Sequence, residues 1–96
     1  MLGLEIVYTK SPSIVSRKIA EEAVLVPIRQ TLGEDPSIFT LNEVGAKIWD
    51  LIDGTRSARE ICETVSAEFD VDPSVAQQDL LKLLAQLKEI RIIREK

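Results

Sequence analysis

The 96-residue sequence contains no histidine and a single cysteine, Cys62. Histidine is the commonest metal ligand and the commonest general base, so its absence leaves little material for a metal site or for acid–base catalysis. One cysteine excludes an intramolecular disulfide, and the sequence shows no base that would activate its thiol. The composition therefore points away from an enzyme.

Long hydrophobic runs are absent as well. No apolar run approaches the roughly 18 residues that a membrane span requires. The segment Met1–Ile6 lacks the basic-then-apolar layout and the small-residue cleavage site of a signal peptide. We therefore expect a cytoplasmic protein with no membrane partner.

Positive charge is also scarce, because the formal net charge is −4. Affinity for nucleic acid is supplied chiefly by Lys and Arg side chains that replace counterions on phosphates. The charge balance therefore argues against a nucleic-acid partner and makes basic partners the easier expectation.

The remaining composition is that of an ordinary globular protein, with 45% hydrophobic and 29% charged residues. These values lie outside the low-hydrophobicity, high-charge regime of disordered chains. The chain is long enough for one domain with a real core but too short for two. One Trp, one Tyr and two Phe are the only aromatic residues available to anchor that core.

Residues 14–41 gather β-branched and aromatic residues in short runs separated by polar or turn residues. This pattern predicts two or three antiparallel strands. The turn signal Gly33–Pro36 should connect a strand near Ala23–Ile28 to one near Ser37–Leu41. Because Pro27 has no donor for the ladder, we expect the first of these strands to be interrupted or bulged there.

The first thirteen residues allow two interpretations. Leu2, Leu4, Ile6 and Tyr8 alternate as they would in a strand, but Lys10–Ser13 soon breaks the pattern. Residues 1–13 are therefore predicted to be either an extra strand or a loosely attached N-terminal arm.

From Asn42 the hydrophobic period becomes helical. Asn42 is a suitable N-cap for a first helix, which should end at Asp53–Gly54. The segment Ser57–Glu60 is a capping box that opens a second helix. A third helix should run over about Pro73–Glu89, with Asp72 as its cap and the proline at its first position.

Together these elements predict an α+β fold, in which a small antiparallel sheet of two or three strands is followed by three helices. The architecture is winged helix-turn-helix-like, and the domain is expected to span residues 14–93. Ile90–Ile93 should form a short extension along the sheet or the core, and Arg94–Lys96 should fray.

The predicted third helix carries a wider apolar arc than one core contact needs. One stripe is formed by Ala76, Leu80, Leu83, Leu87 and Ile90, and Leu81, Leu84 and Ala85 widen it. The helix is either central, touched on two sides, or it uses Leu81, Leu84 and the stem of Lys88 as the floor of a groove for a partner. Both interpretations stay open at this stage.

The predicted strand Ser37–Leu41 is the second candidate site. If it is an edge strand, its unpaired amides and carbonyls can accept an extended peptide as an added strand. The alternative is an edge that is blunted by Pro36 and by the N-terminal arm. The sequence does not separate these two possibilities.

Three other residues invite functional interpretations that are weaker than structural ones. Trp49 fits a core position better than a partner contact. Asp50 and Asp53 are helical neighbours, but Asp53 suits helix termination better than a paired-carboxylate site. Cys62 lies on the expected buried face, where a thiol behaves as a small hydrophobe.

A winged-helix DNA-binding regulator is the alternative function. Five basic residues could support it, namely Arg56, Arg59, Arg91, Arg94 and Lys96. However, the helix that would read the major groove begins with Pro73–Asp79, which contains no Lys or Arg. Gln77 and Gln78 are of a residue type that can read adenine.

Several short motifs also carry a family resemblance. They are Val24–Ile28, Phe39–Asn42, Gly45, Ile48–Trp49, Asp53–Gly54 and Phe69–Pro73. In this order and spacing they resemble the PqqD-like family (coenzyme PQQ synthesis protein D), the peptide recognition element of systems that modify ribosomally made peptides. The likeness covers about residues 14–93.

The resemblance implies a three-stranded sheet packed on three helices, with no catalytic activity and no cofactor. In such proteins the leader of a precursor peptide lies as an additional strand between the third strand and the third helix. The domain then hands the peptide to a modifying enzyme, often a radical SAM protein. Carried to this sequence, the peptide-binding residues are Ile38, Phe39, Thr40, Leu80, Leu81, Leu84 and Lys88. The resemblance does not select PQQ biosynthesis over another pathway, and exposed strand edges would permit a homodimer.

Overall fold

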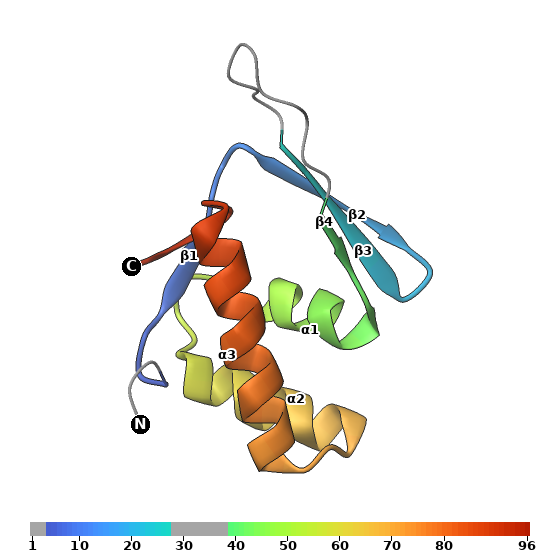
Figure 1. Ribbon diagram of the computed structural model, residues 1–96, viewed down its shortest axis with the longest axis vertical. Helices are drawn as coiled ribbons and strands as arrows, with labels where there is room; N and C mark the ends of the chain where they lie inside the picture. The colour runs from blue at the N-terminus through green and yellow to red at the C-terminus, as the bar shows by residue number, and fades with distance from the viewer. Residues whose placement is uncertain (1–3, 28–38) are drawn as a thin grey trace.

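Five short strands and three helices make up the part of the chain that the computed structural model describes, residues 4–27 and 39–96. In chain order they are β1 (Tyr8–Lys10), β2 (Ile14–Ile19), β3 (Glu22–Pro27), β4 (Phe39–Leu41), α1 (Glu43–Leu51), α2 (Ala58–Phe69), α3 (Pro73–Glu89) and β5 (Ile93–Glu95). Figure 1 shows the three helices between a three-stranded sheet and a small ribbon that contains β1. The α+β prediction is confirmed.

The three-stranded sheet is antiparallel, with the strand order β2-β3-β4. Ala23 pairs with Leu41 and Leu25 pairs with Phe39. Ala23, Leu25 and Leu41 are buried, so this face of the sheet packs on the helices, whereas β2 is largely exposed. Pro27 lies opposite Ile14 and is the last residue of β3 before the undescribed residues 28–38, so the predicted interruption falls at the limit of the described chain. The predicted turn Gly33–Pro36 lies outside the described residues.

All three helices begin at the predicted caps. The Asn42 side chain accepts a hydrogen bond from the Gly45 amide at 2.8 Å. Ser57 and Glu60 form the reciprocal capping box, in which each side chain accepts from the other's backbone amide. Asp72 accepts from the Ser74 amide, and α3 then runs over Pro73–Glu89 as predicted.

Asp53 holds the turn between α1 and α2. Its carboxylate accepts hydrogen bonds from the Thr55 and Arg56 amides at 2.9 and 3.1 Å and from the Thr55 hydroxyl at 2.8 Å. These hydrogen bonds, with a smaller contribution from the Arg56 guanidinium, lower the pKa of Asp53 from 3.8 to about 2. Gly54 follows with a φ of 83°, a conformation that favours glycine.

We expect Asp53→Asn to destabilise the protein at neutral pH and to have little effect near pH 2. Because the folded state depresses this pKa, the stabilisation is fully present above pH 3.8 and is lost as the pH falls toward about 2. Urea unfolding of both proteins over that pH range measures the effect. A difference in unfolding free energy that stays constant with pH would contradict this role for the carboxylate.

The two chain ends pair with each other in the small ribbon. β1 and β5 are antiparallel, with Tyr8 opposite Glu95 and Lys10 opposite Ile93. The Lys96 amide continues the pairing by donating to the Val7 carbonyl at 2.8 Å. The expectation that Arg94–Lys96 would fray was therefore wrong, because the N-terminal segment supplies a strand partner that the local pattern does not reveal.

The N-terminal segment is tied to α2 as well. The carbonyls of Leu4 and Ile6 accept hydrogen bonds from the Arg59 and Ala58 amides, at 2.8 and 2.9 Å. These amides lie in the first turn of α2, where no partner exists within the helix. Residues 4–10 thus complete the start of a helix that is distant in sequence.

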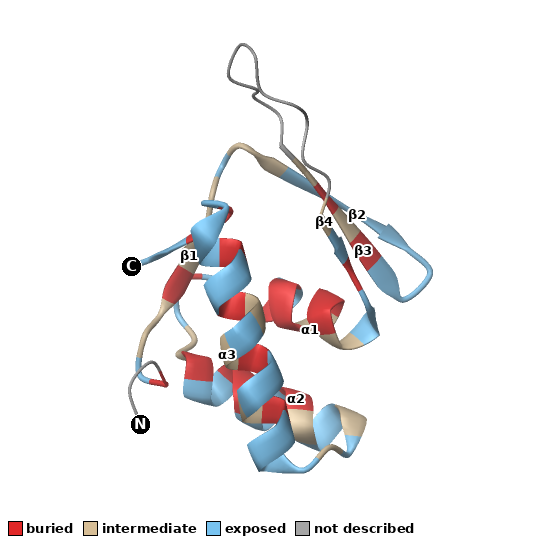
Figure 2. Ribbon diagram, in the orientation of Figure 1, coloured by how far each residue is buried: buried red, intermediate tan, exposed pale blue. Residues whose placement is uncertain are grey.

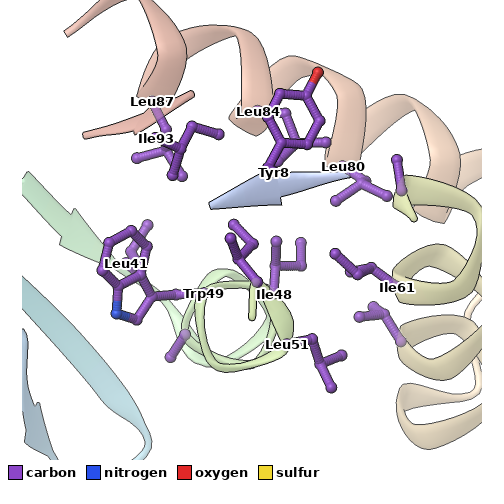
Figure 3. Close-up of a cluster of buried hydrophobic side chains, with 14 of the residues drawn as sticks. Tyr8, Leu41, Ile48, Trp49, Leu51, Ile61, Leu80, Leu84, Leu87 and Ile93 are labelled. Atoms are coloured by element: carbon purple, nitrogen blue, oxygen red, sulfur yellow. The ribbon is translucent and has the colours of Figure 1, made fainter. Parts of the chain in front are cut away.

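The core lies where the helices, the sheet and the ribbon meet (Figures 2 and 3). Trp49 is 3% exposed and belongs to this core, which agrees with its structural interpretation. Its ring is capped by the Lys10 ammonium group, which lies 4.7 Å from the ring centroid. None of the helices in the described part of the chain combines the length and the apolar character that crossing a membrane requires.

Candidate functional site

A groove of about 640 Å³ is bordered by residues of β4, α1 and α3. Figure 1 shows α1 between β4 and α3. It is lined by Glu22, Phe39, Thr40, Leu41, Asn42, Val44, Gly45, Ile48, Val65, Val71, Ala76, Asp79, Leu83 and Gln86. Four apolar side chains in this lining are only half-buried, namely Phe39, Val44, Val71 and Leu83. The groove therefore offers apolar contacts that the described chain does not use fully.

One wall of the groove is β4, which pairs with β3 along one edge only. In the described part of the chain no strand pairs with the other edge. The N-terminal segment does not cover it, since residues 8–10 pair with β5 in the separate ribbon. A strand edge next to an apolar groove can accept an extended peptide through main-chain hydrogen bonds.

Gly45 allows β4 to end directly against α1. A Cβ atom at Gly45 would lie 3.3 Å from the Leu41 side chain and 3.3 Å from the Asn42 Oδ1 atom. A larger residue would crowd these two side chains. Gly45 thus permits close packing where β4 leads into α1.

The other wall is the face of α3 that carries Ala76, Asp79, Leu83 and Gln86. These residues follow each other at steps of three and four, so they lie on one side of the helix. Leu80 and Leu84 are 1% and 2% exposed, and they pack in the core with Leu87 (Figure 3). The apolar arc is wide because one part of it faces the core and an adjacent part faces the groove.

Among the predicted binding residues, Phe39 and Thr40 line the groove. Leu80, Leu81, Leu84 and Lys88 do not. Leu81 is half-buried and outside the lining, and the Lys88 ammonium pairs with the Glu95 carboxylate of β5. Ile38 lies outside the described residues.

The structure therefore assigns the helical wall of this groove to Leu83 and its neighbours rather than to Leu81, Leu84 and Lys88. The sequence pattern did include Leu83 in the apolar stripe. What it lacked was the position of β4, which selects the flank of the stripe that faces the strand.

Catalytic and metal-binding interpretations gain no support from the described residues, which contain no cluster of three or more His, Cys, Asp or Glu suited to a metal ion. Asp50 pairs with Lys18, and Asp53 pairs with Arg56. Cys62 is buried, and this burial raises the pKa of its thiol, which disfavours the nucleophilic thiolate.

Several of the basic residues that would have supported DNA binding are engaged within the protein. Arg59 pairs with Glu5 at 2.7 Å and Arg56 pairs with Asp53. The Lys96 ammonium donates to the Gly54 carbonyl at 2.8 Å. These contacts tie the chain ends and the α1–α2 turn together and leave fewer cations for a phosphate backbone.

Comparison with known proteins identifies similar chains. The model of the family described as coenzyme PQQ synthesis protein D (PqqD) matches residues 22–93. A PqqA binding protein of Xanthomonas oryzae pv. oryzae is 33% identical over 57 residues, which cover 59% of this chain and 62% of that protein. The corresponding protein of Xanthomonas campestris pv. campestris is 32% identical over the same coverage. The chain thus spans a little under two thirds of the length of these relatives.

Among solved structures, a similar one is TbiB1 in complex with the TbiA(beta) leader peptide. It superposes with a TM-score of 0.74 at 28% sequence identity. The alignment covers 90% of this chain and 94% of that one. The similarity therefore extends over nearly all of both chains.

Proposed function

Because the chain belongs to the family of coenzyme PQQ synthesis protein D, we propose that it is a non-catalytic carrier that binds the leader segment of a ribosomally made precursor peptide. The leader adds as a strand to the unpaired edge of β4. Its side chains on one side fill the groove in front of α3. The chain then presents the peptide to a modifying enzyme, for which a radical SAM protein is our first candidate.

The observation that carries this proposal is the position of the β4 edge beside the half-buried side chains of Phe39 and Leu83. Strand addition supplies main-chain hydrogen bonds for affinity, and the adjacent apolar groove supplies side-chain selectivity. An unpaired strand edge on its own could pair with any other exposed strand and so promote aggregation. An edge beside a groove of about 640 Å³ favours one specific guest.

The relatives support the same function. The curated proteins of Xanthomonas are PqqA binding proteins, and the TbiB1 structure contains a leader peptide. Neither comparison selects a precursor for this chain, so we leave the pathway open between PQQ biosynthesis and another modified peptide.

We also propose a cytoplasmic location, where the precursor is made. The exposed edge of β2 leaves room for a homodimer.

Titration of the ¹⁵N-labelled protein with candidate leader peptides tests the proposal. We expect the largest amide shifts at Phe39, Thr40 and Leu41, with further shifts around Leu83. The β4 amides should also exchange more slowly with deuterium, because strand pairing protects them. A response confined to the exposed face of α2, around Glu63, would contradict binding at this groove.

A further inference from the structure

The charged residues that line the groove in the described part of the chain are both acidic. They are Glu22 and Asp79, which are exposed, and none of the described lining residues is a Lys or an Arg. Two polar lining residues, Thr40 and Gln86, are uncharged. The groove therefore presents negative charge above an apolar floor.

The two carboxylates lie toward the same end of the groove. Glu22 precedes Ala23, which pairs with Leu41, so Glu22 sits at the end of β4 that leads into α1. Asp79 lies in the first half of α3, one turn before Leu83. β4 and α3 run in opposite directions in Figure 1, so the end of β4 and the beginning of α3 fall on the same side.

Further negative charge surrounds this end. Interaction with the neighbouring Glu21 carboxyl raises the pKa of Glu43. Glu43 directly follows Asn42 of the groove lining. Like charges this close favour the uptake of either a proton or a cation.

The neighbouring cations do not neutralise Glu22 or Asp79. Lys47 pairs with Glu68 at 3.2 Å, and Lys18 pairs with Asp50. Within residues 4–27 and 39–96, no ion pair is formed by Glu22 or by Asp79. Lys82 lies three positions after Asp79 on α3, but in the same part of the chain it forms no ion pair with Asp79, so a ligand cation can still pair with either carboxylate.

We propose that this groove selects a leader segment with a Lys or Arg side chain at the Glu22–Asp79 end and apolar side chains beside Phe39 and Leu83. This inference rests on the proposed function and adds the chemical class of the guest. In an added strand, residues two apart point to the same side. A basic residue spaced by two or four positions from an apolar one can then point toward Asp79 of α3 while the apolar side chain fills the groove.

Selection from a displayed library of random peptides, long enough to cover β4 and both of its ends, tests the inference. We expect the bound pool to be enriched in Lys and Arg at a fixed spacing from an apolar residue and depleted in Asp and Glu. Peptides that bind the groove without this enrichment would overturn the charge selection and leave the proposed function intact. A library from which no peptide binds the groove would overturn both.

A charge-reversed variant gives the quantitative test. For a selected Lys-containing peptide, Asp79→Lys should weaken binding about tenfold, the factor that corresponds to about 1.4 kcal/mol. The same variant should bind better than the wild type when the peptide's lysine is replaced by glutamate. Equal affinities of wild type and variant for both peptides would contradict the inference.

Glu63→Lys is the matched control. It makes the same change of charge at an exposed position of α2 that is outside the groove lining. It should alter the affinity of either peptide by less than about twofold, because exposed charges at a distance are screened by salt. An effect equal to that of Asp79→Lys would mean that only the net charge of the protein matters, which would also overturn the inference.

Discussion

Leu83→Gln is expected to weaken leader binding about thirtyfold while the protein stays folded. Leu83 is half-buried and lines the groove opposite β4, so a ligand that covers it gains about 2 kcal/mol of apolar burial, which a glutamine would forfeit. Glutamine is a good helix former and adds no charge, so α3 should be preserved. Isothermal titration calorimetry with a leader peptide, together with circular dichroism, measures both quantities.

Leu84→Gln is the matched control and should give the opposite result. Leu84 is 2% exposed and packs in the core, so the variant loses buried apolar contacts and leaves an amide without a partner. We expect a loss of about 3–5 kcal/mol of unfolding free energy, a large part of the total for a small domain. If Leu84→Gln stayed stable and lost binding while Leu83→Gln bound normally, the helical wall would be the one predicted from the sequence pattern.

Removal of residues 1–11 should destabilise the domain enough to abolish cooperative folding. The deletion removes β1 and the buried side chains of Leu4 and Tyr8, each contributing about 1.5–3 kcal/mol. It also removes the carbonyl partners of the first α2 amides and the strand partner of β5. The summed loss of about 5 kcal/mol is comparable to the whole stability of a marginal domain.

Urea unfolding followed by tryptophan fluorescence is a suitable measurement, because Trp49 lies in the core. Tyr8→Ala is a smaller version of the same change and should lower the unfolding midpoint without abolishing the transition. An unchanged midpoint after the deletion would mean that residues 1–11 behave in solution as the loosely attached arm that the sequence also allowed.

The local signals in the sequence predicted the helices closely. Asn42, Ser57 and Asp72 each place a side-chain acceptor where the first helical amides need one, so the starts of α1, α2 and α3 follow from a few neighbouring residues. The described parts of β3 and β4 also lie within the predicted strands, because runs of β-branched residues are short-range features.

Long-range pairings could not be predicted in the same way. The end of the chain seemed free to fray because nothing near Arg94–Lys96 stabilises it. Its partner β1 lies more than eighty residues earlier in the sequence. Likewise Lys10, whose ammonium group caps the ring of Trp49, lies in β1, far from α1 in the sequence.

The groove also combines features that the sequence predicts with features that depend on long-range contacts. The sequence predicted an over-wide apolar face on α3 and an edge at Phe39–Thr40, but helical periodicity fixes only which residues share a face. It does not say which flank of that face meets another element. In the folded chain Leu83 lines the groove together with β4, whereas the adjacent Leu84 is buried in the core.

Sequence by itself thus determined the helix boundaries, the antiparallel strands and the scarcity of catalytic groups, since each depends on residues a few positions apart or on composition. Tertiary structure alone decided the β1–β5 ribbon and the residues of the groove wall, which include Glu22 and Asp79. These features join segments that are far apart in the chain, and their contacts arise only when the apolar faces of distant elements pack together.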